Sequence, residues 1–416
     1  MLSKKFTSRK CPLCGANQIT LIYQFQQLPL GDLISNNKVD ARSEKLYPMN
    51  LVGCIKCLHL FLSEVVDPDL SYSNYQFNSA SSPALKNFMS ESIDWLLSQK
   101  TTLKSGLVLD IGANDGTWLE LFAARGFEVF GVEPSNQFEV MSDKGIPGIR
   151  DYFDVTSSAE IEMLLNKDGK EVSIITVNNT FANVEHPSEF IANIVNLMND
   201  ETLLSIVTGY HLDQFPVGMF DYIYHEHLSY FSVSDFNKLA EIHNLEILNV
   251  RKFPLKGGSI QIIMRKKTSR ENKYPDTVLS SLMWESWFIR NHGDYFENIS
   301  LQIKGTIERG REICNAVLDS GYNFHGYGYS HSSATLMYEL QLQNRLIGIF
   351  DDNSSRQGKY TPGSGIKICD PSDELKNSEG VIILAWQHDA RILEKLKEFD
   401  YRGVILHPFQ GIKKLT

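Results

Sequence analysis

Long apolar runs are missing from this 416-residue chain. No segment approaches the roughly 20 consecutive apolar residues that a membrane-spanning helix needs, so we expect no membrane partner. An excess of positive charge is also missing, because 50 acidic residues outnumber 40 basic ones and give a formal net charge of -10. We therefore expect no nucleic acid partner, although a local basic pocket could hold a diphosphate.

The first ten residues are basic and reach Cys11 without the apolar core of a signal peptide, which predicts a cytoplasmic protein. Apolar residues make up 42% of the chain and charged residues 22%, as in ordinary folded proteins. At roughly 150 residues per domain, the length predicts two or three domains.

Cysteine is scarce, and its placement does not suggest a disulfide framework. Two of the six cysteines, Cys314 and Cys369, are isolated, and the other four form the pairs Cys11-Pro-Leu-Cys14 and Cys54-Ile-Lys-Cys57. A two-residue gap lets both thiolates of a pair reach one metal ion, and two such pairs complete the four-sulfur shell of a structural zinc site. The alternatives are unrelated buried or oxidised cysteines, or a redox pair.

A glycine turn follows a short apolar run at residues 107–111, which predicts a buried parallel strand. Gly112 and Gly116 permit close approach of a ligand at the carboxyl end of that strand, where open α/β sheets bind ligands. A second predicted strand, residues 128–132, ends in Glu133, whose carboxylate is suited to the ribose hydroxyls of an adenosine.

Three cofactors compete for this turn: a dinucleotide, a nucleoside triphosphate and S-adenosylmethionine. The turn lacks the full G-x-G-x-x-G spacing and the lysine of a P-loop, whereas a looser turn with Asp110 and Asn114 suffices where no pyrophosphate is bound. The pattern resembles the first motif of class I methyltransferases, which favours S-adenosylmethionine. A third apolar strand, residues 172–177, ends at Asn178, at the same predicted edge. A purely structural turn remains the alternative.

Residues 220–232 are dense in histidine, carboxylate and phenol, and we call them the histidine segment. Its chemistry-bearing side chains are Tyr222, Tyr224, His225, Glu226, His227 and Tyr230. Such a group can supply a base, a residue that orients it and hydrogen-bonding phenols. An extended backbone would place the two histidines on one face with Glu226 opposite, whereas a turn could direct all three inward. Aromatic packing and a metal site are the alternatives, although the helical H-E-x-x-H spacing is absent.

Together these motifs resemble the sugar C-methyltransferases, which methylate carbon three of nucleotide-linked 4-keto-deoxy sugars. The resemblance rests on the four cysteines, Leu-Asp-Ile-Gly-Ala-Asn-Asp-Gly at 109–116, Tyr-His-Glu-His-Leu-Ser-Tyr-Phe-Ser at 224–232, Gly-Gly-Ser at 257–259, Arg-Gln-Gly-Lys-Tyr-Thr-Pro-Gly at 356–363 and Ala-Trp at 385–386. It implies that His227 is the catalytic base, with Glu226 and Tyr224 as its helpers. The chemistry requires such a group, because carbon becomes nucleophilic only when a base removes a proton beside the ketone and the enolate is stabilised.

The resemblance also implies substrate contacts at Tyr222, Ser259 and an aromatic pair that we assign to Tyr75 and Phe77, with Tyr72 as the alternative member. Two positions depart from the family pattern. Asn183 stands where the family usually has histidine, and Ser332 stands where it usually has lysine. These departures leave the sugar open, and Asn183 is still expected to line its site.

We predict an α/β fold in three parts: a zinc-binding unit at 1–75, a class I methyltransferase domain at 76–265, and a helical linker with a Rossmann-like sugar-nucleotide-binding domain at 266–416. In the last part we expect strands at 323–328, 346–350, 381–385 and 403–407. The expected partner is a nucleotide-diphosphate-linked keto sugar, and the expected state is a monomer or small homo-oligomer. The alternatives are an O- or N-methyltransferase and a catalytically silent sugar-nucleotide-binding protein.

Overall fold

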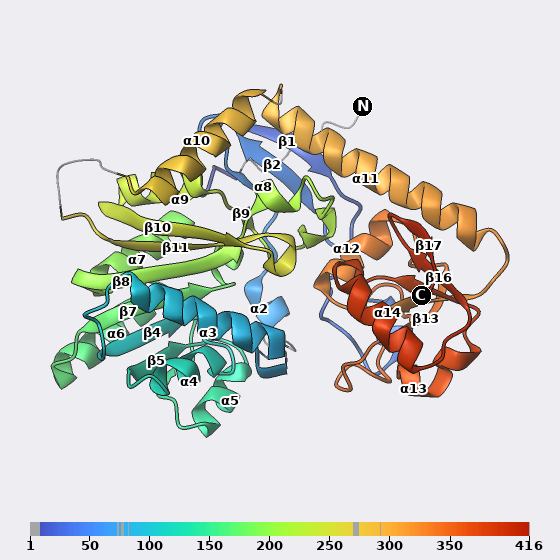
Figure 1. Ribbon diagram of the computed structural model, residues 1–416, viewed down its shortest axis with the longest axis horizontal. Coiled ribbons are helices and arrows are strands. Elements are labelled where there is room, and N and C mark those ends of the chain that lie inside the picture. Colours follow the sequence, from blue (N-terminus) through green and yellow to red (C-terminus); the bar gives the residue numbers. More distant parts are fainter. Residues whose placement is uncertain are drawn as a thin grey trace.

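The computed structural model describes residues 9–72, 75, 79–81, 83–268, 274–291 and 293–415. Its strands form a four-stranded, a seven-stranded and a six-stranded sheet within these ranges. Figure 1 shows the seven-stranded sheet and the six-stranded sheet in two separate lobes. The predicted α/β class is confirmed.

The seven-stranded sheet has the order β10-β11-β8-β7-β4-β5-β6. The strands from β8 to β6 are parallel, and β10 and β11 form an antiparallel pair at the other edge. The strands are β4 (Leu107–Ile111), β5 (Glu128–Val132), β6 (Gly148–Ile149), β7 (Val172–Asn178), β8 (Met198–Gly209), β10 (Leu245–Phe253) and β11 (Ser259–Lys266). All residues of β4 are buried, as expected of a parallel strand covered by helices on both faces.

Helices cover this sheet on both sides (Figure 1). They are α3 (Pro83–Ser98), α4 (Thr117–Ala123), α5 (Gln137–Asp143), α6 (Val155–Asp168), α7 (Pro187–Leu197) and α9 (Val233–Ile242). The amphipathic helix α7, for example, buries Phe190, Ile191 and Ile194. The parallel strands therefore present their carboxyl ends at one edge, where the glycine turn lies.

The N-terminal sheet has the order β1-β2-β3-β9, with antiparallel neighbours. Its first three strands are β1 (Ile19–Gln24), β2 (Asn50–Cys54) and β3 (Leu60–Leu62), accompanied by α1 (Lys38–Arg42) and α2 (Pro68–Tyr72). The fourth strand, β9 (Ser229–Tyr230), belongs to the histidine segment. The N-terminal unit is thus joined to that segment by backbone hydrogen bonds.

The C-terminal sheet has the order β14-β13-β12-β15-β16-β17, parallel except for β17. Its strands are β12 (Phe324–Tyr327), β13 (Leu346–Phe350), β14 (Ile368–Cys369), β15 (Gly380–Ile383), β16 (Val404–His407) and β17 (Gly411–Lys413). Its helices are α12 (His331–Glu339), α13 (Pro371–Glu374) and α14 (Asp389–Glu398). The four strands predicted here are confirmed, and the short β14 and β17 were missed.

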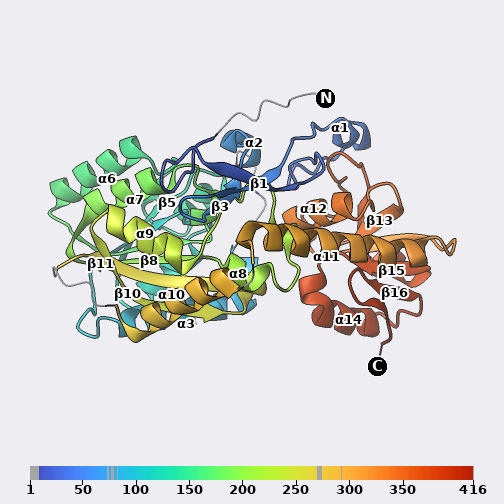
Figure 2. The same ribbon diagram turned by 90° about the horizontal axis from the view of Figure 1, so that it is seen from above.

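Two helices join the lobes, α10 (Asp276–Asn291) and α11 (Tyr295–Leu318). Figure 1 and Figure 2 both show α11 extending from the region of β1 to the C-terminal sheet. The N-terminal unit contacts the C-terminal unit directly, since the backbone N–H of Gln26 donates to Glu339 Oε1 at 2.7 Å. Across the described ranges, every helix is too short or too polar to cross a lipid bilayer.

Candidate functional site

The glycine turn joins β4 to α4 at the carboxyl edge of the seven-stranded sheet. Gly112 has φ +77°, and a Cβ placed there would lie 2.1 Å from Thr180 Oγ1. Both the left-handed backbone and the close approach require glycine. The backbone N–H of Gly112 donates to the Val132 carbonyl at 2.8 Å, and Gly116, also left-handed, is the N-cap of α4. The turn is therefore fixed against the end of β5.

Glu133 lies directly after β5 and is 5% exposed. Its Oε2 accepts the backbone N–H of Asn114 at 2.8 Å, and its Oε1 accepts that of Ser135 at 2.9 Å. Asn114 is itself left-handed and accepts a hydrogen bond from the Ser79 hydroxyl. The structure thus brings Asn114 and Glu133 together with the glycine turn.

Asp110 is the penultimate residue of β4 and lies beside β7 near the same edge of the sheet. Its Oδ1 accepts hydrogen bonds from Thr176 Oγ1 at 2.6 Å and Asn178 Nδ2 at 3.3 Å. Burial raises the pKa of Asp110 to about 7, against the opposing effect of those two donors. Asn178 Oδ1 and Asn183 Oδ1 are buried, and neither has a partner of normal hydrogen-bond geometry in the part of the chain described. These two oxygens are free to accept from a ligand.

The histidine segment turns sharply at His225 and Glu226, because the backbone N–H of His227 donates to the Tyr224 carbonyl at 2.9 Å. The two imidazoles consequently face different surroundings. His225 is 5% exposed and meets the Tyr47 ring at a centroid distance of 5.9 Å. His227 instead meets Tyr224, with ring centroids 4.0 Å apart. Of the two backbone arrangements considered, the structure has the turn.

His227 is held at both ring nitrogens. Its Nδ1 lies 3.1 Å from the Tyr222 carbonyl, and its Nε2 lies 2.8 Å from Tyr224 Oη. A carbonyl can only accept, so we assign the proton to Nδ1, and the Tyr224 hydroxyl donates to Nε2. Burial, with the nearby positive charge of Lys256, lowers the pKa of His227 to about 3. The imidazole is therefore a neutral base whose lone pair points at a phenol.

Glu226 is paired across the molecule. Its Oε1 lies 3.6 Å from Nε2 of His331, at the start of α12, and the same nitrogen lies 3.2 Å from Asp32 Oδ2 in the N-terminal unit. Reasoning from the sequence missed His331 and Asp32. Asp32 carries no motif signal, and His331 stands beside Ser332 in a turn where only Ser332 drew attention.

Tyr75 contacts α5 and lies near His331. Burial raises its pKa, and the charges of Asp32, Glu226 and Glu133 act in the same direction. Its ring centroid is 6.4 Å from that of His331, and its carbonyl accepts from Gln137 Nε2 at 3.2 Å. The Tyr75 backbone thus contacts α5, and its ring lies near His331, which itself approaches Glu226.

The other predicted substrate contacts have different surroundings. Ser259 is fully buried and belongs to the second glycine turn, residues 257–259, before β11. Its hydroxyl donates to the Leu255 carbonyl at 2.9 Å. Phe77 lies outside the described residues. Asn183 ends the short helix η2 (Phe181–Asn183), where the Phe181 ring packs on Phe231 of the histidine segment at 4.7 Å. Reasoning from the sequence missed Lys256, in η4 (Leu255–Gly257), although it immediately precedes the Gly-Gly-Ser turn at 257–259.

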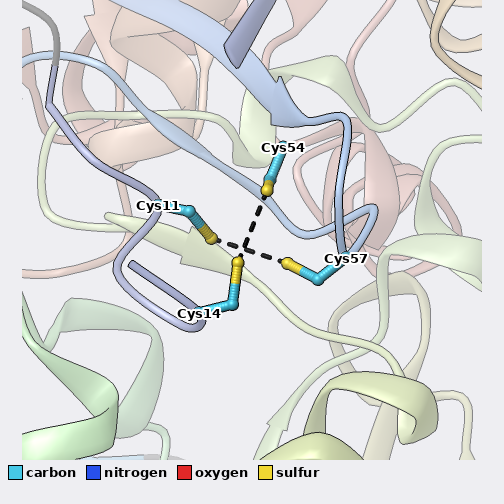
Figure 3. A group of neighbouring side chains, drawn as sticks. All are labelled: Cys11, Cys14, Cys54 and Cys57. Atoms are coloured by element: carbon cyan, nitrogen blue, oxygen red, sulfur yellow. Dashed lines mark hydrogen bonds between the residues drawn. The ribbon is translucent and has the colours of Figure 1, made fainter. Parts of the chain in front are cut away.

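The four N-terminal cysteines form one cluster (Figure 3). All four sulfur atoms lie within 4.8 Å of one another, with Cys11 and Cys57 3.5 Å apart and Cys14 and Cys54 3.6 Å apart. A tetrahedral zinc ion with Zn–S bonds of about 2.3 Å separates its sulfurs by about 3.8 Å. The residues present fit a metal ion held by four thiolates.

Two family models cover most of the chain. Residues 85–250 match a methyltransferase domain, and residues 254–407 match a C-methyltransferase C-terminal domain. C-methyltransferase NovU of Streptomyces niveus is 26% identical over 405 residues, which span 95% of this chain and 93% of that protein. Over nearly its whole length the chain is thus similar to a C-methyltransferase.

Two solved structures that match part of this chain are the following. The plantazolicin methyltransferase BamL is 14% identical, with a TM-score of 0.37 over 45% of this chain and 87% of that chain. Magnesium protoporphyrin IX methyltransferase from Synechocystis PCC 6803 is 14% identical, with a TM-score of 0.33 over 47% of this chain and 88% of that chain.

These matches assign the reaction class. The protein is an S-adenosylmethionine-dependent methyltransferase, as the glycine turn indicated. The matched methyltransferase domain contains both the glycine turn and the histidine segment, and the matched C-terminal domain contains His331. The two matched regions therefore meet where His331 approaches Glu226.

Proposed function

We propose that this C-methyltransferase adds a methyl group to carbon three of a nucleoside-diphosphate-linked 4-keto-deoxy sugar through an enolate. The observation that carries the proposal is the hydrogen bond between Tyr224 Oη and His227 Nε2, at 2.8 Å. It combines a neutral base with a hydroxyl donor, the two groups that enolate formation beside a ketone needs. The substrate class, a nucleotide-linked keto sugar, is inferred from the family resemblance.

The Tyr224 hydroxyl is a single donor with two acceptors in the proposed reaction. Before substrate binds, it donates to His227 Nε2. The ketone oxygen of the sugar takes over this hydrogen bond, which frees the Nε2 lone pair for the proton on carbon three. That proton moves to Nε2, the electrons of the C–H bond pass into the carbon–carbon bond of the enolate, and the negative charge develops on the oxygen that faces Tyr224. Burial raises the pKa of Tyr224, so the phenol keeps its proton and acts as a donor.

S-adenosylmethionine supplies an electrophilic methyl group when bound. We assign its site to Asp110, Gly112, Asn114, Gly116, Glu133 and Asn178. Glu133 is suited to ribose hydroxyls, because each of its oxygens accepts one backbone hydrogen bond and retains capacity for another. The partnerless Asn178 Oδ1 is suited to the ammonium of the methionine part.

The sugar nucleotide has its proposed contacts at Tyr75, Phe77, Asn183, Tyr222 and Ser259. Tyr75 supports this assignment best, because its ring lies near His331, which approaches Glu226. Ser259 supports it least directly, since its hydroxyl is engaged within its own turn. We also propose that the cysteine cluster holds zinc in a structural role, since four thiolates close its coordination shell.

The test is transfer of a labelled methyl group from S-adenosylmethionine to a panel of nucleoside-diphosphate 4-keto-deoxy sugars. We expect label on carbon three and loss of the proton there. Label on an oxygen or nitrogen would identify an O- or N-methyltransferase instead. Absence of transfer to every sugar of the panel would reject the proposed substrate class.

A further inference from the structure

Helix α12 of the C-terminal unit lies directly against the histidine segment. Thr335 Oγ1 donates to the Ile223 carbonyl at 2.9 Å. One helical turn earlier, the His331 ring stacks on Tyr224, with centroids 5.4 Å apart and an angle of 24° between the rings. Residues four apart share a helix face, so one face of α12 contacts the consecutive residues Ile223 and Tyr224 of the segment.

His331 also links two buried carboxylates that belong to different parts of the molecule. Its Nε2 lies 3.2 Å from Asp32 Oδ2 and 3.6 Å from Glu226 Oε1. The side chains of Asp32 and Glu226 are each 6% exposed, and that of His331 is 16% exposed. Neither oxygen has a hydrogen-bond partner in the described part of the chain, and burial without a partner is costly, so the approach of the His331 imidazole to both oxygens is favourable. Arg356 approaches Asp32 from the other side, at 3.8 Å.

The N-terminal unit is shaped for this contact at Gly31. A Cβ there would lie 2.8 Å from the His331 Cα, closer than real Cβ atoms approach a backbone atom. The Tyr329 hydroxyl donates to the Gly31 carbonyl at 2.9 Å and ties the same loop to the start of α12. His331 is thus placed from two sides, by its own helix and by the Gly31 loop.

We propose that His331 is a positioning residue for methyl transfer, through which the C-terminal unit completes the catalytic group. It stacks on Tyr224 and pairs with Glu226, and this keeps the Tyr224 hydroxyl aimed at His227 Nε2. The proposal rests on the function proposed above for Tyr224 and His227. It gives the C-terminal unit a part in the geometry of the base, in addition to any contact with the substrate.

The test compares variants that disturb this placement in different ways. His331→Phe keeps a ring to stack but removes the paired nitrogen, and His331→Gln keeps a hydrogen-bond donor. Gly31→Ala displaces His331 without changing an ionisable group, so it tests the proposal even if His331→Phe folds poorly. His388→Gln, elsewhere in the C-terminal unit, is the matched control.

We expect kcat for methyl transfer to fall at least tenfold in His331→Phe and Gly31→Ala, since a displacement of about 1 Å in a catalytic group can cost about 100-fold. His331→Gln should recover part of the loss. The KM for the sugar and the affinity for S-adenosylhomocysteine should stay within twofold of wild type, and His388→Gln should match wild type throughout. Unchanged kcat, or a raised KM with unchanged kcat, overturns the proposal.

A second readout does not depend on the sugar. Nitrogen NMR of isotope-labelled histidine, with the His227 signals assigned through His227→Asn, reports the hydrogen bond at Nε2 directly. We expect the Nε2 resonance to move in His331→Phe and Gly31→Ala but not in His388→Gln, and an unmoved resonance overturns the proposal. If wild type methylates no sugar of the panel, the proposed function fails, and this measurement still decides the placement of His331.

Discussion

The Tyr224 hydroxyl donates to Nε2 of His227 across 2.8 Å, while the Tyr222 carbonyl accepts from Nδ1 of the same ring. One backbone carbonyl therefore selects the tautomer, and one phenol occupies the lone pair that takes the substrate proton in the proposed reaction. The proposed base and the hydroxyl donor are hydrogen-bonded to each other. The predictions below test what this unit and its supports do.

Replacing Tyr224 with Phe removes the proposed enolate donor while keeping the ring. Loss of a single donor to a developing oxyanion typically lowers kcat by about 100-fold to 1,000-fold. We expect a loss in that range, with little change in the affinity for S-adenosylhomocysteine, measured by steady-state kinetics and calorimetry. Tyr322→Phe, at an exposed tyrosine of the C-terminal unit, is the control. Wild-type kcat in Tyr224→Phe would show that the hydroxyl is not needed.

The pH profile of kcat should not show an ionisation near 6.5, the ordinary pKa of histidine. The pKa of His227 is lowered to about 3, so its imidazole is already neutral at pH 5 and above. With saturating cofactor, we expect kcat to stay level as the pH falls through 6.5. Asp110, whose pKa is raised to about 7, is checked separately with Asp110→Asn. A decline in kcat centred near pH 6.5 that persists in Asp110→Asn would contradict the lowered pKa.

Stability, unlike kcat, should depend on the protonation of buried histidines. The unfolded chain takes up protons at its histidines near pH 6.5, whereas His227 and His211 have folded-state pKa values of about 3 and about 4. Their contribution to stability is complete above pH 6.5 and is lost as the pH falls toward those values. The raised pKa of Asp110 acts in the opposite sense, so the readout is a comparison of thermal unfolding in wild type and His227→Asn. The midpoint of wild type should fall more than that of His227→Asn over that range, and an equal change in the two proteins would contradict the lowered pKa of His227.

Gly112 and Gly126 form a matched pair for the glycine turn. Both are left-handed, with φ +77° and +89°, but a Cβ at Gly126 meets nothing within 4 Å, whereas at Gly112 it meets Thr180. Gly126→Ala should cost about 1–2 kcal/mol from the backbone alone. Gly112→Ala should cost more and weaken S-adenosylhomocysteine binding at least tenfold, measured by denaturant unfolding and calorimetry. Equal effects of the two substitutions would exclude the close approach as the reason for glycine.

Loss of the proposed zinc ion should disturb the histidine segment as well as the N-terminal unit. His59, two residues after Cys57, contacts Ser229 at 3.2 Å and Asp235 at 3.2 Å, and β3 pairs with β9. We expect Cys57→Ser to lose bound zinc, unfold at lower temperature and lose methyl transfer, measured by metal analysis, calorimetry and activity. Cys369→Ala, in β14, should keep wild-type zinc content. Full zinc content in Cys57→Ser would exclude the four-cysteine site.

The sequence predicted best what depends on local pattern. The bounds of β4 and β5 agree with the predicted strands because apolar runs in buried parallel strands end where the glycine turn and Glu133 begin. The pairing of the two cysteine motifs likewise followed from their spacing. Such features need only neighbouring residues to be recognised.

Contacts between distant segments could not be predicted in this way. The pairing of β9 with β3 and the approach of His331 to Glu226 depend on how the three units dock, and neither leaves a periodic signal. The orientation of His225 and His227 depended on a backbone turn that the residues alone left open. The catalytic assignment therefore came from the family resemblance, and its geometry came from the structure.

Exchange of the proton on carbon three tests the central claim most directly. A nucleoside-diphosphate 4-keto-deoxy sugar is incubated with enzyme in deuterium oxide without S-adenosylmethionine, and deuterium at each carbon is followed by NMR. Wild type should incorporate deuterium at carbon three, and His227→Asn should not, although it binds S-adenosylhomocysteine as wild type does. Undiminished exchange in His227→Asn would show that another group removes the proton.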